Sequence, residues 1–335
     1  MKILVTGGAG FIGSHFIRHR LENYPGDTVV NVDVLTHAGV RESLRDVETA
    51  HAGRYQFEKA DICDYDAIDA IVKRYGTSAI INFAAESHNS YAVLNPTAFY
   101  RTNLMGTQNL LEITRKNGLE RFHHISTCEV YGDLALDSGE MFREDAPLVP
   151  NTPYNSSKAC ADLAVGAYYK SFGIPVTISN CSNNYGPYQF PEKLIPLFVT
   201  NLMEGKPLTL YKESMNKREW LHVGDHCRAV SAILDRGRIG ETYNIGSGVE
   251  KSVEEISDRI LSLMGKSEKE KTYVPSRPAH DRRYLLDSSK IRRELGWAPA
   301  IGFDEGIKAT VEWYADNREW WEPLLDRRPL DEANW

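Results

Sequence analysis

The chain has 335 residues, of which 42% are hydrophobic and 25% are charged, and its formal net charge is −7. At about 150 residues per domain, this length predicts two domains or one large α/β unit with a smaller lobe. The apolar content excludes a disordered chain, and the acidic balance argues against a general nucleic-acid-binding protein. No apolar run approaches the roughly 18 residues of a membrane span. The five cysteines form no CxxC pair, so we expect no metal site, no disulfide framework and a cytoplasmic location.

Short apolar runs alternate with helical patterns through the first half of the chain. We expect strands near residues 3–5, 28–32, 56–60, 79–83, 122–126 and 175–179, and helices near 12–21, 64–75 and 96–116. This alternation predicts a Rossmann-type, doubly wound parallel α/β sheet over residues 1–185. Beyond residue 185 prolines cluster and the alternation weakens. Residues 186–335 are therefore expected to form mostly a smaller substrate-binding lobe, with some segments returning to the sheet. A ligand cleft is expected between the two parts.

A glycine turn follows the first predicted strand. Gly7, Gly10 and Gly13 have the spacing G-x-x-G-x-x-G, which permits a tight turn, close approach of a pyrophosphate and close packing of helix on strand. Asp33 ends the second predicted strand. A carboxylate at this position hydrogen-bonds a ribose hydroxyl of NAD and would repel the 2′-phosphate of NADP. We therefore predict an NAD site rather than a purely structural turn. Asp61 follows the third strand and either contacts the adenine or is an ordinary strand-end residue.

Tyr154 and Lys158 are four residues apart, so on a helix they share one face. A nearby cation lowers the pKa of a phenol, which makes it a usable base for a sugar hydroxyl. The structural alternative is a solvated pair on a helix surface. Because the pair lies downstream of a nucleotide-binding turn, the catalytic interpretation is favoured.

Together these features resemble the extended short-chain dehydrogenase/reductase superfamily. More narrowly, the chain is similar to nucleoside-diphosphate-sugar 4,6-dehydratases of the dTDP-glucose type over roughly residues 1–315. The segments that carry this resemblance are 84–88 (AAESH), 126–132 (STCEVYG), 180–188 (NCSNNYGPY), 190–196 (FPEKLIP), 218–223 (REWLHV), 243–246 (YNIG) and 277–284 (RPAHDRRY).

The resemblance implies a lyase that uses NAD in a redox-neutral dehydration of a nucleoside-diphosphate hexose. Tyr154, tuned by Lys158, would remove the proton of the C4 hydroxyl while the C4 hydride passes to NAD. Thr127 would hydrogen-bond the same sugar oxygen, and Glu129 would remove the C5 proton. The C6 hydroxyl would leave as water and the hydride would return to C6, giving a 4-keto-6-deoxy sugar nucleotide.

Two departures from the family pattern leave alternatives open. Cys128 occupies the position at which dTDP-glucose enzymes carry an aspartate that protonates the leaving hydroxyl, and a thiol is a weaker hydrogen-bond donor. Cys128 or a water would then be the acid, or Cys128 is an inert buried thiol. The outcome could also be a 5,6-ene, a 4-epimerisation or decarboxylation, or binding without catalysis. Glu129 argues against an epimerase, which needs no base at C5. Residues 89–92 (NSYA) replace an Asp-Arg-Ser segment, which leaves the hexose undetermined.

The resemblance also implies the binding residues. Those expected to hold the cofactor are Gly7, Gly10, Phe11, Ile12, Gly13, Asp33, Asp61, Ile62, Ala84, Ala85, Tyr154 and Lys158. Those expected to hold the sugar nucleotide are Ser87, His88, Asn183, Lys193, Arg218, Asn244, Arg277 and His280. A homodimer is expected through two long helices near residues 96–116 and 153–172.

Overall fold

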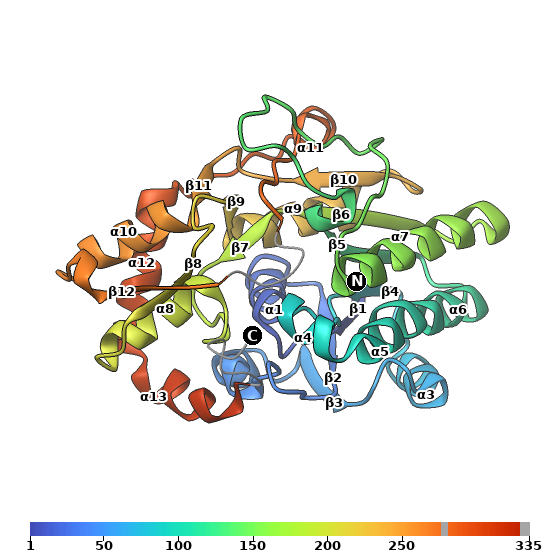
Figure 1. Ribbon diagram of the computed structural model, residues 1–335. Helices are drawn as coiled ribbons and strands as arrows, with labels where there is room; N and C mark the ends of the chain where they lie inside the picture. The colour runs from blue at the N-terminus through green and yellow to red at the C-terminus, as the bar shows by residue number, and fades with distance from the viewer. Residues whose placement is uncertain (276–280, 329–335) are drawn as a thin grey trace.

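The computed structural model describes residues 1–275 and 281–328. Its centre is a seven-stranded sheet in the order β10-β6-β5-β4-β1-β2-β3, in which every neighbouring pair is parallel (Figure 1). The strands are β1 (Lys2–Thr6), β2 (Thr28–Asp33), β3 (Tyr55–Lys59), β4 (Ala79–Asn82), β5 (Arg121–Thr127), β6 (Val176–Cys181) and β10 (Thr242–Ile245). The predicted Rossmann-type α/β fold is confirmed.

The six strands expected from the sequence are all present within a few residues of their predicted positions. The further strand, β10, comes from the C-terminal part of the chain and pairs with β6, with Thr242 opposite Ile178. Its 4 residues are too few to show a periodic pattern in the sequence. By pairing with β6, β10 satisfies backbone groups that an edge strand would leave open.

Helices cover both faces of the sheet. One face carries α1 (Phe11–Asn23), α9 (Val223–Arg236) and α11 (Ser289–Leu295), and the other carries α3 (Tyr65–Tyr75), α6 (Thr107–Asn117) and α7 (Pro153–Phe172). Successive residues of β1 face opposite layers, because Ile3 and Val5 belong to the first core and Leu4 to the second. The connection after β2 forms η1 (Arg41–Leu44) and α2 (Arg45–Ala50).

The helix expected near residues 96–116 has three parts. After α4 (Asn89–Leu94) come α5 (Pro96–Phe99), a π-helical segment η2 (Tyr100–Gly106) and then α6. Within η2, Asn103 accepts a hydrogen bond from the Glu86 N–H at 2.9 Å and donates to Ser157 Oγ at 2.8 Å. The widened turn therefore ties the loop after β4 to α7, which is the helix of the Tyr–Lys pair.

The second lobe has its own sheets and core (left side of Figure 1). A three-stranded sheet contains β7 (Asn183–Tyr185), β9 (Lys217–His222) and β11 (Glu250–Ser252), and a two-stranded sheet contains β8 (Leu208–Tyr211) and β12 (Lys271–Val274). The helical elements are α8 (Leu194–Met203), α10 (Val253–Leu263), η4 (Glu268–Glu270), α12 (Phe303–Asp316), α13 (Arg318–Trp321) and η5 (Glu322–Arg327). No helix within the described residues is long and apolar enough to cross a bilayer.

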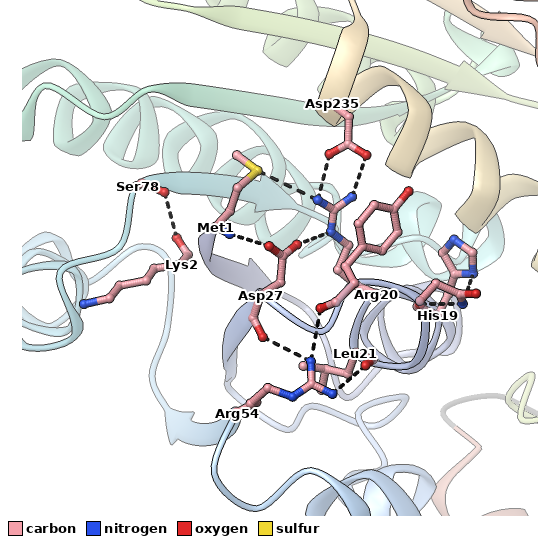
Figure 2. A network of polar contacts seen from close by, with 11 residues as sticks. Met1, Lys2, His19, Arg20, Leu21, Asp27, Arg54, Ser78 and Asp235 are labelled. Carbon is pink, nitrogen blue, oxygen red and sulfur yellow. Dashed lines mark hydrogen bonds and ion pairs between the residues drawn. The ribbon is translucent and has the colours of Figure 1, made fainter.

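A buried ionic network joins the C-terminal part of the chain to the first βα unit (Figure 2). Arg20 of α1 is 2% exposed and lies between two carboxylates, with Asp27 at 2.5 Å and Asp235 of α9 at 2.7 Å. Burial acts to lower the pKa of Arg20, but the hydrogen bonds to Asp235 and Asp27 outweigh it and raise that pKa. Arg20 therefore links α1 to α9 through Asp235 and to the start of β2 through Asp27.

Candidate active site

Two adjoining cavities lie at the carboxyl ends of the sheet strands. The larger has a volume of about 560 Å³ and the smaller, which extends into the second lobe, about 240 Å³. Residues common to both linings are Ser87, Glu129, Asn183 and Lys193. The predicted cleft between sheet and lobe is therefore present, and these side chains lie where its two halves meet.

The glycine turn forms one wall of the larger cavity. Gly7 has φ +67°, and a Cβ there would lie 2.6 Å from the Ala84 backbone nitrogen. A Cβ on Gly13 would lie 2.4 Å from the Gly7 carbonyl oxygen, so α1 can pack this closely only on glycine. Gly10 is the N-cap of α1 and presents the positive end of the helix to the cavity. These features fit a bound pyrophosphate.

Every residue expected to hold the cofactor lines this larger cavity. The set is Gly7, Gly10, Phe11, Ile12, Gly13, Asp33, Asp61, Ile62, Ala84, Ala85, Tyr154 and Lys158. The turn and its acidic partners therefore fit NAD, with the Asp33 carboxylate at the end of β2, where the ribose hydroxyls would lie.

Hydrogen bonds hold two carboxylates in this wall. Asp33 accepts hydrogen bonds from the Ala9 N–H at 3.0 Å and the Leu35 N–H at 2.8 Å. Burial raises the pKa of Asp33, and these donors oppose the rise. Asp61 accepts from the Cys63 N–H at 2.9 Å and from Arg101 at 2.8 Å, and these contacts keep its pKa below the ordinary value although burial opposes them.

The Tyr154–Lys158 pair lies in the first turns of α7. Pro153 starts this helix, and the Thr152 hydroxyl caps it by accepting from the Asn155 N–H at 3.2 Å. Lys158 Nζ donates to the Ile125 carbonyl oxygen at 2.7 Å, and burial lowers the pKa of Lys158 to about 8. Both side chains line the larger cavity, as the shared helix face predicts.

In the protein chain by itself, the pKa of Tyr154 is raised rather than lowered as the nearby lysine predicts. Burial holds the pKa of Tyr154 well above its ordinary value, and the Glu129 carboxylate adds to the rise. A hydrogen bond with Thr127 acts in the opposite direction but is the smaller effect. Removing a phenol from water disfavours its charged form more than the chain's own neighbours favour it.

A buried polar group behind Lys158 was not predicted. His124 of β5 lies with Nε2 3.2 Å from Lys158 Nζ, and Asp162 lies 3.5 Å from the same imidazole nitrogen. Asp162 accepts a hydrogen bond from Ser126 at 2.7 Å, and burial raises its pKa to about 7. Asp162 follows Lys158 by four residues on α7, so the helical spacing was a usable signal.

The end of β5 and the following η3 (Cys128–Tyr131) carry the expected acid and base. Thr127 and Glu129 line the larger cavity, and the Glu129 N–H donates to Thr127 Oγ1 at 3.3 Å. Glu129 Oε2 also accepts a hydrogen bond from Asn89 Nδ2 at 2.8 Å. Asn89 belongs to the segment that departs from the family pattern, and sequence reasoning gave it no role.

Cys128 is buried and interacts electrostatically with Glu129 and Tyr154. It is 1% exposed and packs in an apolar cluster with Tyr131, Tyr284 and Leu286. Within the described part of the chain it lines neither cavity. Burial, reinforced by Glu129, raises the pKa of this thiol well above its ordinary value, so Cys128 stays protonated at neutral pH. Its role as the acid remains a prediction.

The smaller cavity brings together most of the expected sugar-nucleotide residues. Its lining includes Ser87, His88, Asn183, Lys193 and Arg218. Lys193 Nζ donates to the Ser87 carbonyl oxygen at 3.0 Å. Arg218 donates to the Asp281 carbonyl oxygen at 2.8 Å and lies over the Tyr284 ring at 4.8 Å.

Asn244 does not belong to this set, so the expectation that it binds substrate is wrong. Its side chain is fully buried, donates to the Phe142 carbonyl oxygen at 3.0 Å and accepts from the Tyr131 hydroxyl at 3.0 Å. It lines neither cavity among the described residues, because β10 turns it toward the packing behind η3. The expected residues Arg277 and His280 lie outside the described ranges.

A glycine turn after β1, an acidic residue at the end of β2 and a Tyr–Lys helix facing the same cavity define an extended short-chain dehydrogenase/reductase. The family model described as GDP-mannose 4,6 dehydratase matches residues 4–310. The chain thus belongs to this family of NAD-dependent nucleotide-sugar 4,6-dehydratases.

Individual relatives agree with this placement. The chain is 48% identical to the dTDP-glucose 4,6-dehydratase of Streptomyces niveus, over 97% of this chain and 96% of that one. It superposes on the dTDP-glucose 4,6-dehydratase of Streptomyces venezuelae, solved with NAD and TDP, with a TM-score of 0.93 and 46% identity, over 97% of this chain and 100% of that one. The UDP-glucose 4-epimerase of Thermus thermophilus, solved with NAD, is more distant, with a TM-score of 0.86 and 30% identity over 95% and 100% of the two chains.

Proposed function

We propose that the protein is a hydro-lyase that converts a nucleoside-diphosphate hexose, either dTDP-glucose or a UDP-sugar, into its 4-keto-6-deoxy derivative. The observation that carries this proposal is the position of Glu129. Its side chain lines the cavity that holds Tyr154 and Lys158 and also the adjoining cavity of the second lobe. A base at that junction would reach the hexose carbon next to the one oxidised, as elimination requires and 4-epimerisation does not.

NAD, when bound along the glycine turn, supplies the acceptor for the C4 hydride and the donor that returns it at C6. Tyr154 takes the proton of the C4 hydroxyl, and Thr127 holds the same sugar oxygen. Lys158 anchors this end of the site through its bond to the Ile125 carbonyl oxygen. A cation near the phenol favours the phenolate, so the charge of the oxidised nicotinamide would offset part of the effect of burial on Tyr154.

Glu129 then takes the C5 proton, which the neighbouring 4-ketone acidifies. The water that leaves consists of the C6 hydroxyl and one proton, so one carboxyl group could carry the proton from C5 to the departing oxygen. Cys128 is protonated but is buried and lines neither cavity within the described residues, which favours Glu129 or a water over the thiol as the final donor. Lys193 and Arg218 supply cations, and Asn183 an amide, for the diphosphate.

A homodimer in the cytoplasm is part of the same proposal. The helical elements α4, η2 and α7 carry exposed apolar side chains, with Leu94 59%, Met105 53% and Leu163 63% exposed. Apolar side chains exposed on neighbouring helices are typical of a surface that a second chain covers. All five cysteines are free, which suits a reducing compartment. Sedimentation should show a dimer that Leu163→Glu dissociates; a monomer in the unmodified protein would contradict the assembly.

The reaction is tested by incubating the protein, without added NAD, with dTDP-glucose, UDP-glucose and UDP-N-acetylglucosamine. Products are followed by mass spectrometry and proton NMR. Loss of one water with a new C6 methyl doublet is expected. Vinylic protons would instead indicate a 5,6-ene, and unchanged mass with inverted C4 would indicate an epimerase. Conversion of none of the three sugar nucleotides, or net consumption of coenzyme, would overturn the proposal.

A further inference from the structure

Residues 89–92, which differ from the family pattern, include a residue that connects the expected base Glu129 to the start of α7. Asn89 is the first residue of α4, and its side chain lies between Glu129 of η3 and Thr152, the N-cap of α7. We propose that Asn89 is a positioning residue that orients the Glu129 carboxylate for proton abstraction. This inference rests on the proposed function.

The directions of the hydrogen bonds are set by the donors available. Thr152 Oγ1 accepts from the Asn155 N–H at 3.2 Å, and its own proton is directed to Asn89 Oδ1 at 2.8 Å. Because the amide oxygen of Asn89 is thereby the acceptor, its NH₂ group faces Glu129 Oε2 at 2.8 Å. The chain of donors therefore runs from Thr152 through Asn89 to the carboxylate, and a reversed amide would break both contacts.

Two consequences follow for Glu129. The amide N–H of Asn89 donates a hydrogen bond to the ionised carboxylate of Glu129. It offers no acceptor for the O–H of a protonated carboxyl group, so the contact favours the ionised base. It also restrains the Oε2 atom and thus the plane of the carboxylate. Thr152 caps α7, and Tyr154 follows it by two residues. The N-terminus of α7 therefore helps to position both proton-accepting groups, the Tyr154 hydroxyl and the Glu129 carboxylate.

Other groups that face Glu129 must be considered for any pH dependence. Cys128 of η3, Tyr154 of α7, Cys181 of β6 and Tyr284 all interact electrostatically with it. Burial raises the pKa of each, that of Cys181 to about 12, so these groups stay neutral near pH 7. The remaining ionisable residues lining the smaller cavity are His88, Glu192, Lys193, Tyr211, Glu213 and Arg218. All of them are unchanged between the variants compared below.

The test compares Asn89→Leu, Asn89→Asp and the matched control Asn95→Leu, an exposed asparagine at the end of the same short helix. Asn89→Leu removes the donor. Asn89→Asp keeps the acceptor for Thr152 but places a second carboxyl group against Glu129. Each holoenzyme is given dTDP-glucose, or the sugar nucleotide that the unmodified protein dehydrates. Coenzyme reduction by absorbance, deuterium uptake at C5 and loss of water are measured separately, with kcat and KM recorded across pH.

We expect Asn89→Leu to lower kcat for dehydration and C5 exchange about 10- to 100-fold, with KM within about threefold and coenzyme reduction retained. The acidic limb of the rate profile should move to higher pH, and further in Asn89→Asp. Asn95→Leu should behave as the unmodified protein does. The inference would be overturned if both Asn89 variants dehydrated the substrate as fast as the unmodified protein and the acidic limb of the pH–rate profile stayed in place. A parallel fall in coenzyme reduction and C5 exchange, which marks a merely structural role, would overturn it as well. If the unmodified protein dehydrates no sugar nucleotide, the proposed function itself fails.

Discussion

Replacing Lys158 with methionine should abolish most activity. It should also remove the free-energy cost of burying a charged amine in the folded protein. Lys158 is buried and lines the larger cavity, and burial lowers its pKa from 10.5 to about 8. The charged amine is thus less favourable in the folded chain than in the unfolded one. A shift of this size corresponds to about 3 kcal/mol of folding free energy.

The sign of the pH dependence follows from that shift. Below about pH 8 the amine is charged in both states and the whole cost is present, whereas above its unfolded pKa of 10.5 the cost disappears. Methionine removes the cost but leaves the Ile125 carbonyl oxygen without the 2.7 Å bond, a loss of about 1–3 kcal/mol. At pH 7 the Lys158→Met variant should therefore be more stable than the unmodified protein by about 0–2 kcal/mol.

That difference should shrink by about 2 kcal/mol between pH 7 and pH 9.5. Lys158 also holds down the pKa of the neighbouring Asp162, and losing the cation makes ionisation of Asp162 costlier at high pH, which acts in the same direction. Urea unfolding at a series of pH values measures the difference. Lys170→Met, an exposed lysine on the same helix, is the control and should give no such trend. A stability difference that stays constant or grows with pH would refute the reasoning. Dehydration should fall by about 100-fold or more.

Three further substitutions separate catalytic from structural roles. Glu129→Gln should still permit coenzyme reduction by the substrate but lower dehydration by about 10²- to 10⁴-fold, followed by absorbance and product mass. Cys128→Ala should keep kcat within about threefold and lower the free energy of unfolding by about 1 kcal/mol, because the thiol packs in an apolar cluster outside the cavities. Gly13→Ala should weaken NAD binding in calorimetry at least about tenfold, since its Cβ would lie 2.4 Å from the Gly7 carbonyl oxygen.

Each of these has a contrary result. Normal dehydration by Glu129→Gln would show that another group removes the C5 proton. A large loss of dehydration in Cys128→Ala, with coenzyme reduction intact and recovery in Cys128→Asp, would assign the acid role to this position. Unchanged NAD affinity in Gly13→Ala would mean that the turn relaxes without moving the cofactor wall.

Local patterns in the sequence were sufficient for six strands of the sheet, for the glycine turn and for the shared helix face of Tyr154 and Lys158. Short apolar runs that alternate with helical patterns predict the strands, and the glycine spacing before α1 predicts a turn within a single βα unit. Tyr154 and Lys158 share a helix face by spacing alone. Each of these features depends on residues that are close in the chain, so backbone geometry already relates their side chains.

Tertiary packing decided the rest. The seventh strand depends on pairing between Thr242 and Ile178, and the contact between Asn89 and Glu129 spans 40 residues. Whether Cys128 is exposed to the cavity or buried depends on the direction of the chain between β5 and η3. Neighbouring residues in the sequence do not determine this direction. The high pKa of Tyr154 likewise arises from burial by several elements. Exposure to water is a property of the assembled molecule, and it is exposure that determines which side chains can ionise and which can meet a substrate.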